Sequence, residues 1–71
     1  MNPPPQVGDY FKIYSRSLAA SGKVKKVNRV NLIYEALYDV GNVTQLMTLK
    51  LPLYHWQSAK VFRDGKTITT E

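Results

Sequence analysis

The sequence predicts an all-β domain, a partly open barrel of five or six mostly antiparallel strands with one short helical turn. Three observations support this fold class. Short segments rich in β-branched and aromatic residues recur along the chain, and turn-forming Gly, Asn and Asp residues separate them. The alternative of a helix over residues 31–38 fails, because that segment has only eight residues and turn formers at both ends.

Length and composition indicate one small domain without covalent or metal crosslinks. The chain has 71 residues, no cysteine and one histidine, so neither a disulfide nor a tetrahedral zinc site is expected. No apolar run approaches the roughly 20 residues of a membrane-spanning helix, and the N-terminus lacks the features of a signal peptide. We therefore expect a cytoplasmic protein that needs no cofactor and contacts no membrane.

The N-terminal part of the chain predicts an extended segment, a turn and a first strand. Residues 1–6 contain three consecutive prolines, which favour a polyproline II conformation. Val7–Asp9 then provides a turn, and the first strand is expected over Tyr10–Ser15. Within it Phe11 and Ile13 alternate with polar and aromatic residues, so this strand is expected to bury one face and expose the other.

A second strand is expected to return beside the first. Arg16–Ser21 suits a connecting loop, with Leu18 anchoring it to the core, and Gly22–Asn28 forms the strand. Val24 and Val27 lie three residues apart, which would place them on opposite faces of a regular strand. A bulge or a strong bend between them would bring both inward.

A hairpin is predicted next. Asn28–Asn31 forms its turn, since asparagine tolerates the positive φ angles of tight turns. The third strand covers residues 32–38, with an inward set and an outward set. The inward set is Leu32, Tyr34, Ala36 and Tyr38, and the outward set is Ile33, Glu35 and Leu37.

The remaining strands follow from turn and proline positions. Asp39–Asn42 is expected to turn the chain into a long strand over Val43–Leu51, which Pro52 ends. Residues 53–58 are too short and irregular for a full helix and predict a single helical or 3₁₀ turn.

The end of the chain predicts one more core strand. Residues 59–63 form it, Asp64-Gly65 is a turn, and residues 66–71 are either a sixth strand or a tail. The barrel domain is thus expected over residues 7–65, after the proline-rich segment 1–6.

Three of these segments together resemble small SH3-like β-barrels of the KOW and Tudor types. They are Val7-Gly8-Asp9, Gly22-Lys23-Val24 and the stretch from Tyr34 to Gly41. The resemblance is at the level of the superfold. It implies a binding module, because barrels of these groups bind nucleic acid, peptides or partner proteins, and it does not choose among those ligands.

A basic cluster gives the leading functional hypothesis. Ten Lys and Arg against five Asp and Glu give a net charge of +5, which favours polyanions or acidic protein surfaces. Paired first and second strands would bring cations and tyrosines into one patch suited to DNA or RNA. The residues are Tyr10, Lys12, Tyr14, Arg16, Lys23, Lys25, Lys26 and Arg29. The alternative is that these lysines only solvate an exposed strand and block edge pairing.

Aromatic residues near the predicted helical turn suggest a second kind of site. A cage for a methylated cation would need several of these rings to face one another. The candidates are Tyr54, Trp56 and Phe62, with Tyr14 and Tyr34 at the same rim. In a barrel this small, however, Trp56 and Phe62 are needed as core or as the lid on an open barrel end.

Apolar residues outside the core suggest a protein interface. If the third strand turns Tyr34 inward, Ile33 and Leu37 lie together outside. The long fourth strand has apolar residues on both of its faces, and one small core cannot bury both sets. Either Leu46 or the pair Met47 and Leu49 must therefore also face outward. Such an exposed apolar surface would mediate a homodimer or docking to an acidic partner. The alternative is that the strand bends enough to bury both sets.

No catalytic motif is visible. His55 has no nucleophile and orienting acid in a recognisable pattern, the carboxylates are single, and the glycines are isolated. We therefore expect a non-enzymatic binding module, a small regulator or accessory factor that contacts nucleic acid, with the protein-interaction module as the alternative. The short length is consistent with a phage or mobile-element accessory protein, an expectation from size and not from chemistry.

Overall fold

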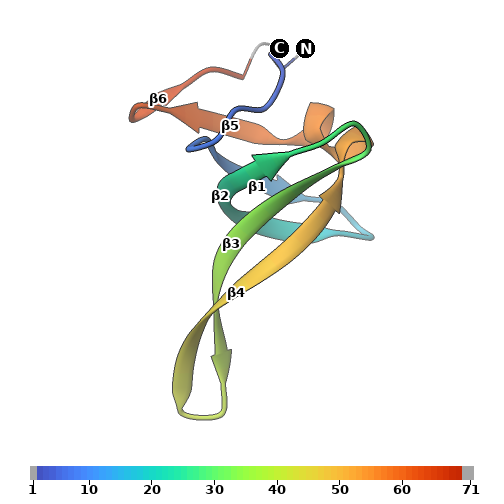
Figure 1. Ribbon diagram of the computed structural model, residues 1–71. Coiled ribbons are helices and arrows are strands. Elements are labelled where there is room, and N and C mark those ends of the chain that lie inside the picture. The colour runs from blue at the N-terminus through green and yellow to red at the C-terminus, as the bar shows by residue number, and fades with distance from the viewer. Residues whose placement is uncertain (1, 70–71) are drawn as a thin grey trace.

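The computed structural model describes residues 2–69 and confirms the all-β fold class. Six strands and one 3₁₀ helix follow one another: β1 (Tyr10–Tyr14), β2 (Ala19–Val27), β3 (Asn31–Val40), β4 (Val43–Pro52), η1 (Leu53–Ser58), β5 (Lys60–Arg63) and β6 (Lys66–Thr67). The strands form one antiparallel sheet in the order β4-β3-β2-β1-β5-β6. Because β4 and β6 are the two edges of this sheet, the barrel is only partly closed (Figure 1).

The curled sheet encloses a small core in which aromatic rings meet edge to face. Phe11 lies at its centre, with its ring centroid 5.0 Å from that of Tyr34 and 5.8 Å from that of Trp56. The 3₁₀ helix η1 carries Trp56 into this core, where 1% of its surface is exposed. The buried apolar residues are Phe11, Ile13, Ala20, Val24, Leu32, Tyr34, Leu51, Trp56, Ala59 and Val61.

The second strand begins earlier than expected, and its predicted bulge is present. Residues 19–21 belong to β2, because they pair with Tyr14, Ile13 and Lys12 of β1, so the loop predicted over Arg16–Ser21 is too long. Leu18 packs against the core as expected. The β2–β3 register shifts between Val24 and Lys26, which brings both Val24 and Val27 opposite buried residues of β3.

Two predicted turns are present, but one forms for a different reason. Asp64 and Gly65 have φ angles of 53° and 77°, as a tight hairpin turn requires. Among residues 2–69, Asp64 is the only non-glycine residue with positive φ, so the asparagine turn does not use that conformation. Instead the Asn28 side-chain oxygen accepts hydrogen bonds from the backbone N–H groups of Val30 and Asn31, at 3.0 and 2.7 Å.

The hairpin of β3 and β4 extends well beyond the core. Pairing of β2 with β3 reaches only to Lys23 and Glu35, whereas β3 and β4 pair as far as Val40 and Val43 (Figure 1). The turn is therefore shorter than the predicted Asp39–Asn42. We call residues 36–47 the hairpin arm. The core position predicted for Tyr38 is wrong: its side chain has the inward parity, but it lies past the end of the core and is 41% exposed.

The N-terminal segment is fixed to the domain, which the sequence did not indicate. The Asn2 side chain is buried, and its Nδ2 donates hydrogen bonds to the carbonyls of Trp56 and Ala59, at 2.6 and 2.8 Å. Trp56 Nε1 in turn donates to the carbonyl of Pro3 at 2.7 Å. Segment 2–6 thus closes over η1, while residue 1 lies outside the described residues.

The predicted C-terminal strand is present but short. Lys66–Thr67 forms β6 and pairs with the end of β5. After it, the backbone N–H of Val61 donates to the Thr69 hydroxyl. Residues 70–71 of the predicted strand or tail lie outside the described residues.

Candidate nucleic-acid interface

Strand β1 exposes the three residues that its alternation predicts. Phe11 and Ile13 are buried, so Tyr10, Lys12 and Tyr14 lie on the outer face of the sheet. Tyr10 is 52% exposed and Tyr14 is 79% exposed, which leaves both rings open to a ligand. Lys12 lies between them in sequence, so cation and rings alternate along the strand.

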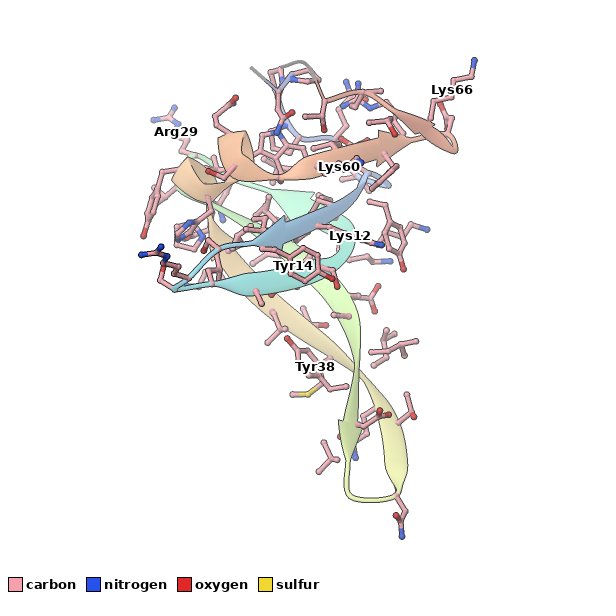
Figure 2. The ribbon with its side chains drawn as sticks, turned by 180° about the vertical axis from the view of Figure 1, so that it is seen from behind. Lys12, Tyr14, Arg29, Tyr38, Lys60 and Lys66 are labelled. Carbon is pink, nitrogen blue, oxygen red and sulfur yellow. The ribbon has the colours of Figure 1, made fainter. Side chains whose placement is uncertain are left out.

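Two neighbouring strands enlarge this face. Tyr10 pairs with Phe62 of β5 and with Lys23 of β2, and Lys12 pairs with Lys60 of β5. Directly paired residues of antiparallel strands lie on the same side of a sheet. Figure 2 shows Lys12 and Lys60 close together, with Tyr14 farther along the same side. We call this surface the basic face: Tyr10, Lys12, Tyr14, Lys23, Lys60 and Phe62.

A hollow of about 530 Å³ lies on the basic face at the end where β1 begins. Its walls combine two aromatic rings, two ammonium groups and one carboxylate. It is lined by Gly8, Tyr10, Lys12, Lys23, Phe62, Asp64 and Gly65. A flat, polar and anionic group such as a nucleotide has complementary partners on these walls.

Two cations of this face, Lys12 and Lys60, form no ion pair among the described residues, whereas Lys23 lies directly opposite Glu35 of β3. The ion pairs within residues 2–69 are Lys25 with Glu35 and Arg63 with Asp9. Lys12 and Lys60 instead lie directly opposite each other, an arrangement that destabilises an antiparallel pair. A bound anion would relieve this repulsion.

An ion pair beneath the basic face fixes β5 against the start of β1. Arg63 donates from Nε and Nη2 to the two carboxylate oxygens of Asp9, both at 2.8 Å. Asp9 is only 1% exposed, and it also accepts a hydrogen bond from the Gln6 N–H at 2.9 Å. The hydrogen bond from Arg63 lowers the pKa of Asp9, and burial opposes this shift only in part. The pair joins the chain just before Tyr10 to the residue after Phe62.

The predicted cations do not form a single patch. Lys25 is held by Glu35 at 3.0 Å, and Lys26 lies beyond it, paired with Ile33. Arg16 lies in the loop before β2, and Arg29 lies in the turn after it. Figure 2 shows Arg29 on the opposite side of the domain from Lys66 and away from Lys12 and Lys60. Of the predicted residues, the structure brings together Tyr10, Lys12, Tyr14 and Lys23.

Sequence reasoning missed Lys60 and misplaced Phe62. Both reach the basic face through the pairing of β1 with β5, which joins segments far apart in the chain. In the sequence, Val61 and Phe62 are adjacent apolar residues, so the pattern does not say which one is buried. The structure buries Val61 completely and leaves Phe62 half-buried on the outer face.

The aromatic cage is not formed. Trp56 and Tyr34 are core residues, and Tyr14 and Phe62 belong to the basic face. Tyr54 is 76% exposed on η1, and its ring lies 4.2 Å from that of His55. Since these rings do not surround a common space, the core role expected for Trp56 is confirmed and the cage hypothesis is wrong.

The predicted interface residues lie on both faces of the hairpin. Leu37 pairs with Leu46 on its outer side, and Met47 pairs with Ala36 on the side that continues the core. Leu37 and Leu46 are strongly exposed, Met47 is 38% exposed, and Ile33 is half-buried at the base. Leu49 packs against the core.

Residues 2–69 contain no group of three or more His, Cys, Asp or Glu side chains placed to hold a metal ion. No helix in this part of the chain is long and apolar enough to cross a membrane.

Comparison of the chain with protein-family models, with curated proteins and with solved structures finds no match. Its function is therefore inferred from the geometry of its surfaces.

Proposed function

We propose that this protein binds single-stranded nucleic acid through the basic face. The observation that carries the proposal is the opposed pair Lys12 and Lys60, with Tyr10 and Phe62 on one side of it and Tyr14 on the other. Two ammonium groups in register supply a site for one phosphate, and the rings supply stacking surfaces for bases.

The spacing along β1 favours a single strand over a duplex. Side chains two residues apart on one face of a strand are separated by roughly 7 Å. Tyr10, Lys12 and Tyr14 therefore present a ring, a cation and a ring in sequence. Bases in a duplex are already paired and stacked, so exposed rings select bases that are unpaired.

The fold supports the same class of function. The chain forms a six-stranded, partly open barrel with a 3₁₀ turn before β5. These features agree with the resemblance to SH3-like barrels of the KOW and Tudor types. Such barrels bind nucleic acid, peptides or partner proteins. The choice of nucleic acid rests on the basic face.

The direct test is a titration followed by fluorescence anisotropy. The full chain is added to a labelled mixed-sequence oligonucleotide, either DNA or RNA, as a single strand and as a duplex. We expect tighter binding to the single strand and an affinity that falls steeply between about 50 and 200 mM salt. Absence of binding at low salt, or a preference for the duplex, overturns the proposal.

Charge-matched variants separate the basic face from the general positive field. Lys12→Gln with Lys60→Gln removes two charges from the face, and Arg16→Gln with Arg29→Gln removes two charges elsewhere. We expect the lysine variant to lose at least about tenfold in affinity and the arginine variant to lose much less. Equal losses would mean that the net charge alone attracts the oligonucleotide.

A second pair of variants tests stacking. Tyr10→Ala removes a ring from the face and should cost roughly 1 to 3 kcal/mol per stacked base. Tyr54→Ala is the control, since Tyr54 is more exposed than Tyr10 and lies on η1. An unchanged affinity for Tyr10→Ala would contradict the stacking role.

An acidic protein partner is the competing ligand for the same cations. Polyglutamate of matched charge offers carboxylates without bases, so it should bind more weakly than the oligonucleotide and should not respond to Tyr10→Ala. If polyglutamate binds as tightly as the oligonucleotide, an acidic protein surface replaces nucleic acid as the proposed partner.

A further inference from the structure

The hairpin arm exposes the largest group of apolar side chains in the described part of the chain. Six large apolar residues of residues 36–47 are between 38% and 71% exposed. They are Leu37, Tyr38, Val40, Val43, Leu46 and Met47. They occupy both faces of the arm, because Leu37 and Leu46 pair on one face and the pair Val40 and Val43 lies on the other. A concentration of exposed apolar side chains on one projecting element is typical of an interaction surface.

The arm also lacks neighbours at its edges. β4 is an edge strand of the sheet, and β3 has no β2 partner beyond Glu35. Figure 1 shows the arm as a two-stranded ribbon that leaves the barrel. Isolated two-stranded hairpins are at best marginally stable in water, and long uncharged edges are templates for pairing with another chain. The arm therefore has the features of an element that a partner completes.

The distribution of charge indicates which partner. All ten Lys and Arg residues lie outside residues 36–49, where Asp39 is the single charged residue. Asp39 accepts a hydrogen bond from the Thr44 hydroxyl at 2.7 Å on the arm itself. An acidic partner would be drawn to the basic barrel, so the arm has no charge with which to select it. Two copies of this chain, in contrast, repel each other least where their positive charges are absent.

We propose that the hairpin arm binds the arm of a second copy of this chain. A two-fold contact requires a surface that is complementary to itself, and an uncharged apolar ribbon meets that condition. Because the arms project from the barrels, the contact keeps the two positively charged barrels apart. The dimer does not depend on the nucleic-acid proposal, although it would present two basic faces to one strand.

The exposed area is sufficient for a small stable interface. Six half-exposed apolar side chains offer roughly 350 Å² of apolar surface per copy, or roughly 700 Å² for two. Stable interfaces bury about 1,200 to 2,000 Å² in total, of which somewhat more than half is apolar. Burial of both faces of the arm thus reaches the lower end of this range.

Sedimentation equilibrium of the full chain tests the proposal, after nuclease treatment so that nucleic acid cannot link two copies. We expect a monomer–dimer equilibrium, with dimer predominating at about 100 µM protein. The variant carrying Leu37→Thr, Val43→Thr and Leu46→Thr removes apolar groups from both faces. It keeps the net charge and the β propensity, and its association should weaken at least about tenfold.

A matched control uses exposed apolar residues outside the arm. Val7 and Val30 are 68% and 67% exposed, so Val7→Thr with Val30→Thr should leave the association unchanged. Fluorescence of the buried Trp56 checks that each variant keeps its core. Amide hydrogen exchange in β4 should slow as the protein concentration rises. A chain that stays monomeric up to about 1 mM, or an arm variant that associates as strongly as the control, would overturn the proposal.

Discussion

Lys12 and Lys60 lie directly opposite each other on the antiparallel strands β1 and β5, on the outer face of the sheet. No carboxylate of residues 2–69 forms an ion pair with either of them. Their repulsion therefore lowers the stability of the unbound protein, and an anion placed between them would recover it. Stability and binding should respond in opposite directions when one of these lysines is neutralised.

Replacing Lys60 by Gln should raise the melting temperature. Removal of one like charge from a directly opposed pair should add roughly 0.2 to 1 kcal/mol to the free energy of unfolding at low salt. The gain should shrink at about 1 M salt, because screening already weakens the repulsion there. Thermal unfolding at both salt concentrations measures the effect, with Arg29→Gln as the control, because Arg29 lies in the turn between β2 and β3 and opposes no cation in the sheet. A lower melting temperature for Lys60→Gln would contradict the repulsion.

Replacing Asp9 by Asn should destabilise the domain near neutral pH. The substitution weakens the paired hydrogen bonds with Arg63 and should cost about 2 kcal/mol. Because the folded-state pKa of Asp9 is below its ordinary value of 3.8, its contribution is complete above that pH and is lost as the pH falls through the folded-state pKa. The difference between the two proteins should thus shrink below about pH 4, as measured by urea unfolding across pH. A difference that stays constant down to pH 2 would exclude this role.

Replacing Gly22 by Ala should also destabilise the domain. A Cβ atom at this position would overlap the Glu35 carbonyl oxygen and lie 2.7 Å from Cδ2 of Tyr34. Relief of this overlap requires β2 and β3 to separate, which should cost about 1 to 3 kcal/mol. Ser21→Ala is the control, since residue 21 is exposed on the same strand. Equal stability of Gly22→Ala and Ser21→Ala would show that β2 and β3 can separate at position 22 without a measurable cost in free energy.

Replacing Asn2 by Ala should release the N-terminal segment from η1. Two carbonyl groups, those of Trp56 and Ala59, lose their side-chain donor, at a cost of about 1 to 3 kcal/mol in all. The chain contains a single tryptophan, so Trp56 fluorescence reports directly on the opening of this region. Urea unfolding followed by this signal measures the loss. Gln6→Ala provides a control within the same segment, and an equal effect of both changes would contradict the anchoring role of Asn2.

Local sequence signals predicted much of the fold. The alternation of Phe11 and Ile13 set the inner face of β1, and the spacing of Val24 and Val27 located the bulge in β2. Asp64-Gly65 marked a hairpin turn, because few residues other than these tolerate its positive φ angles. Each of these features depends on residues close together in the chain.

The candidate site was predicted only in part. Tyr10, Lys12 and Tyr14 followed from the alternation of β1, and Lys23 followed from the expected antiparallel partner strand. Lys60 and Phe62 could not be found in this way, because they reach the basic face only through the pairing of β1 with β5. The electrostatic partners of Lys25 and Arg63 likewise come from distant strands.

The sequence by itself determined the strand pattern, the positions of the turns and the excess of positive charge, since alternation, turn chemistry and composition are local properties. The tertiary structure alone decided which cations face one another and where the core ends. Tyr34 and Tyr38 share one face of β3, yet one is buried and the other is 41% exposed. Periodicity gives the face of a side chain, but burial also requires a second layer above it, and only the packed chain shows where that layer stops.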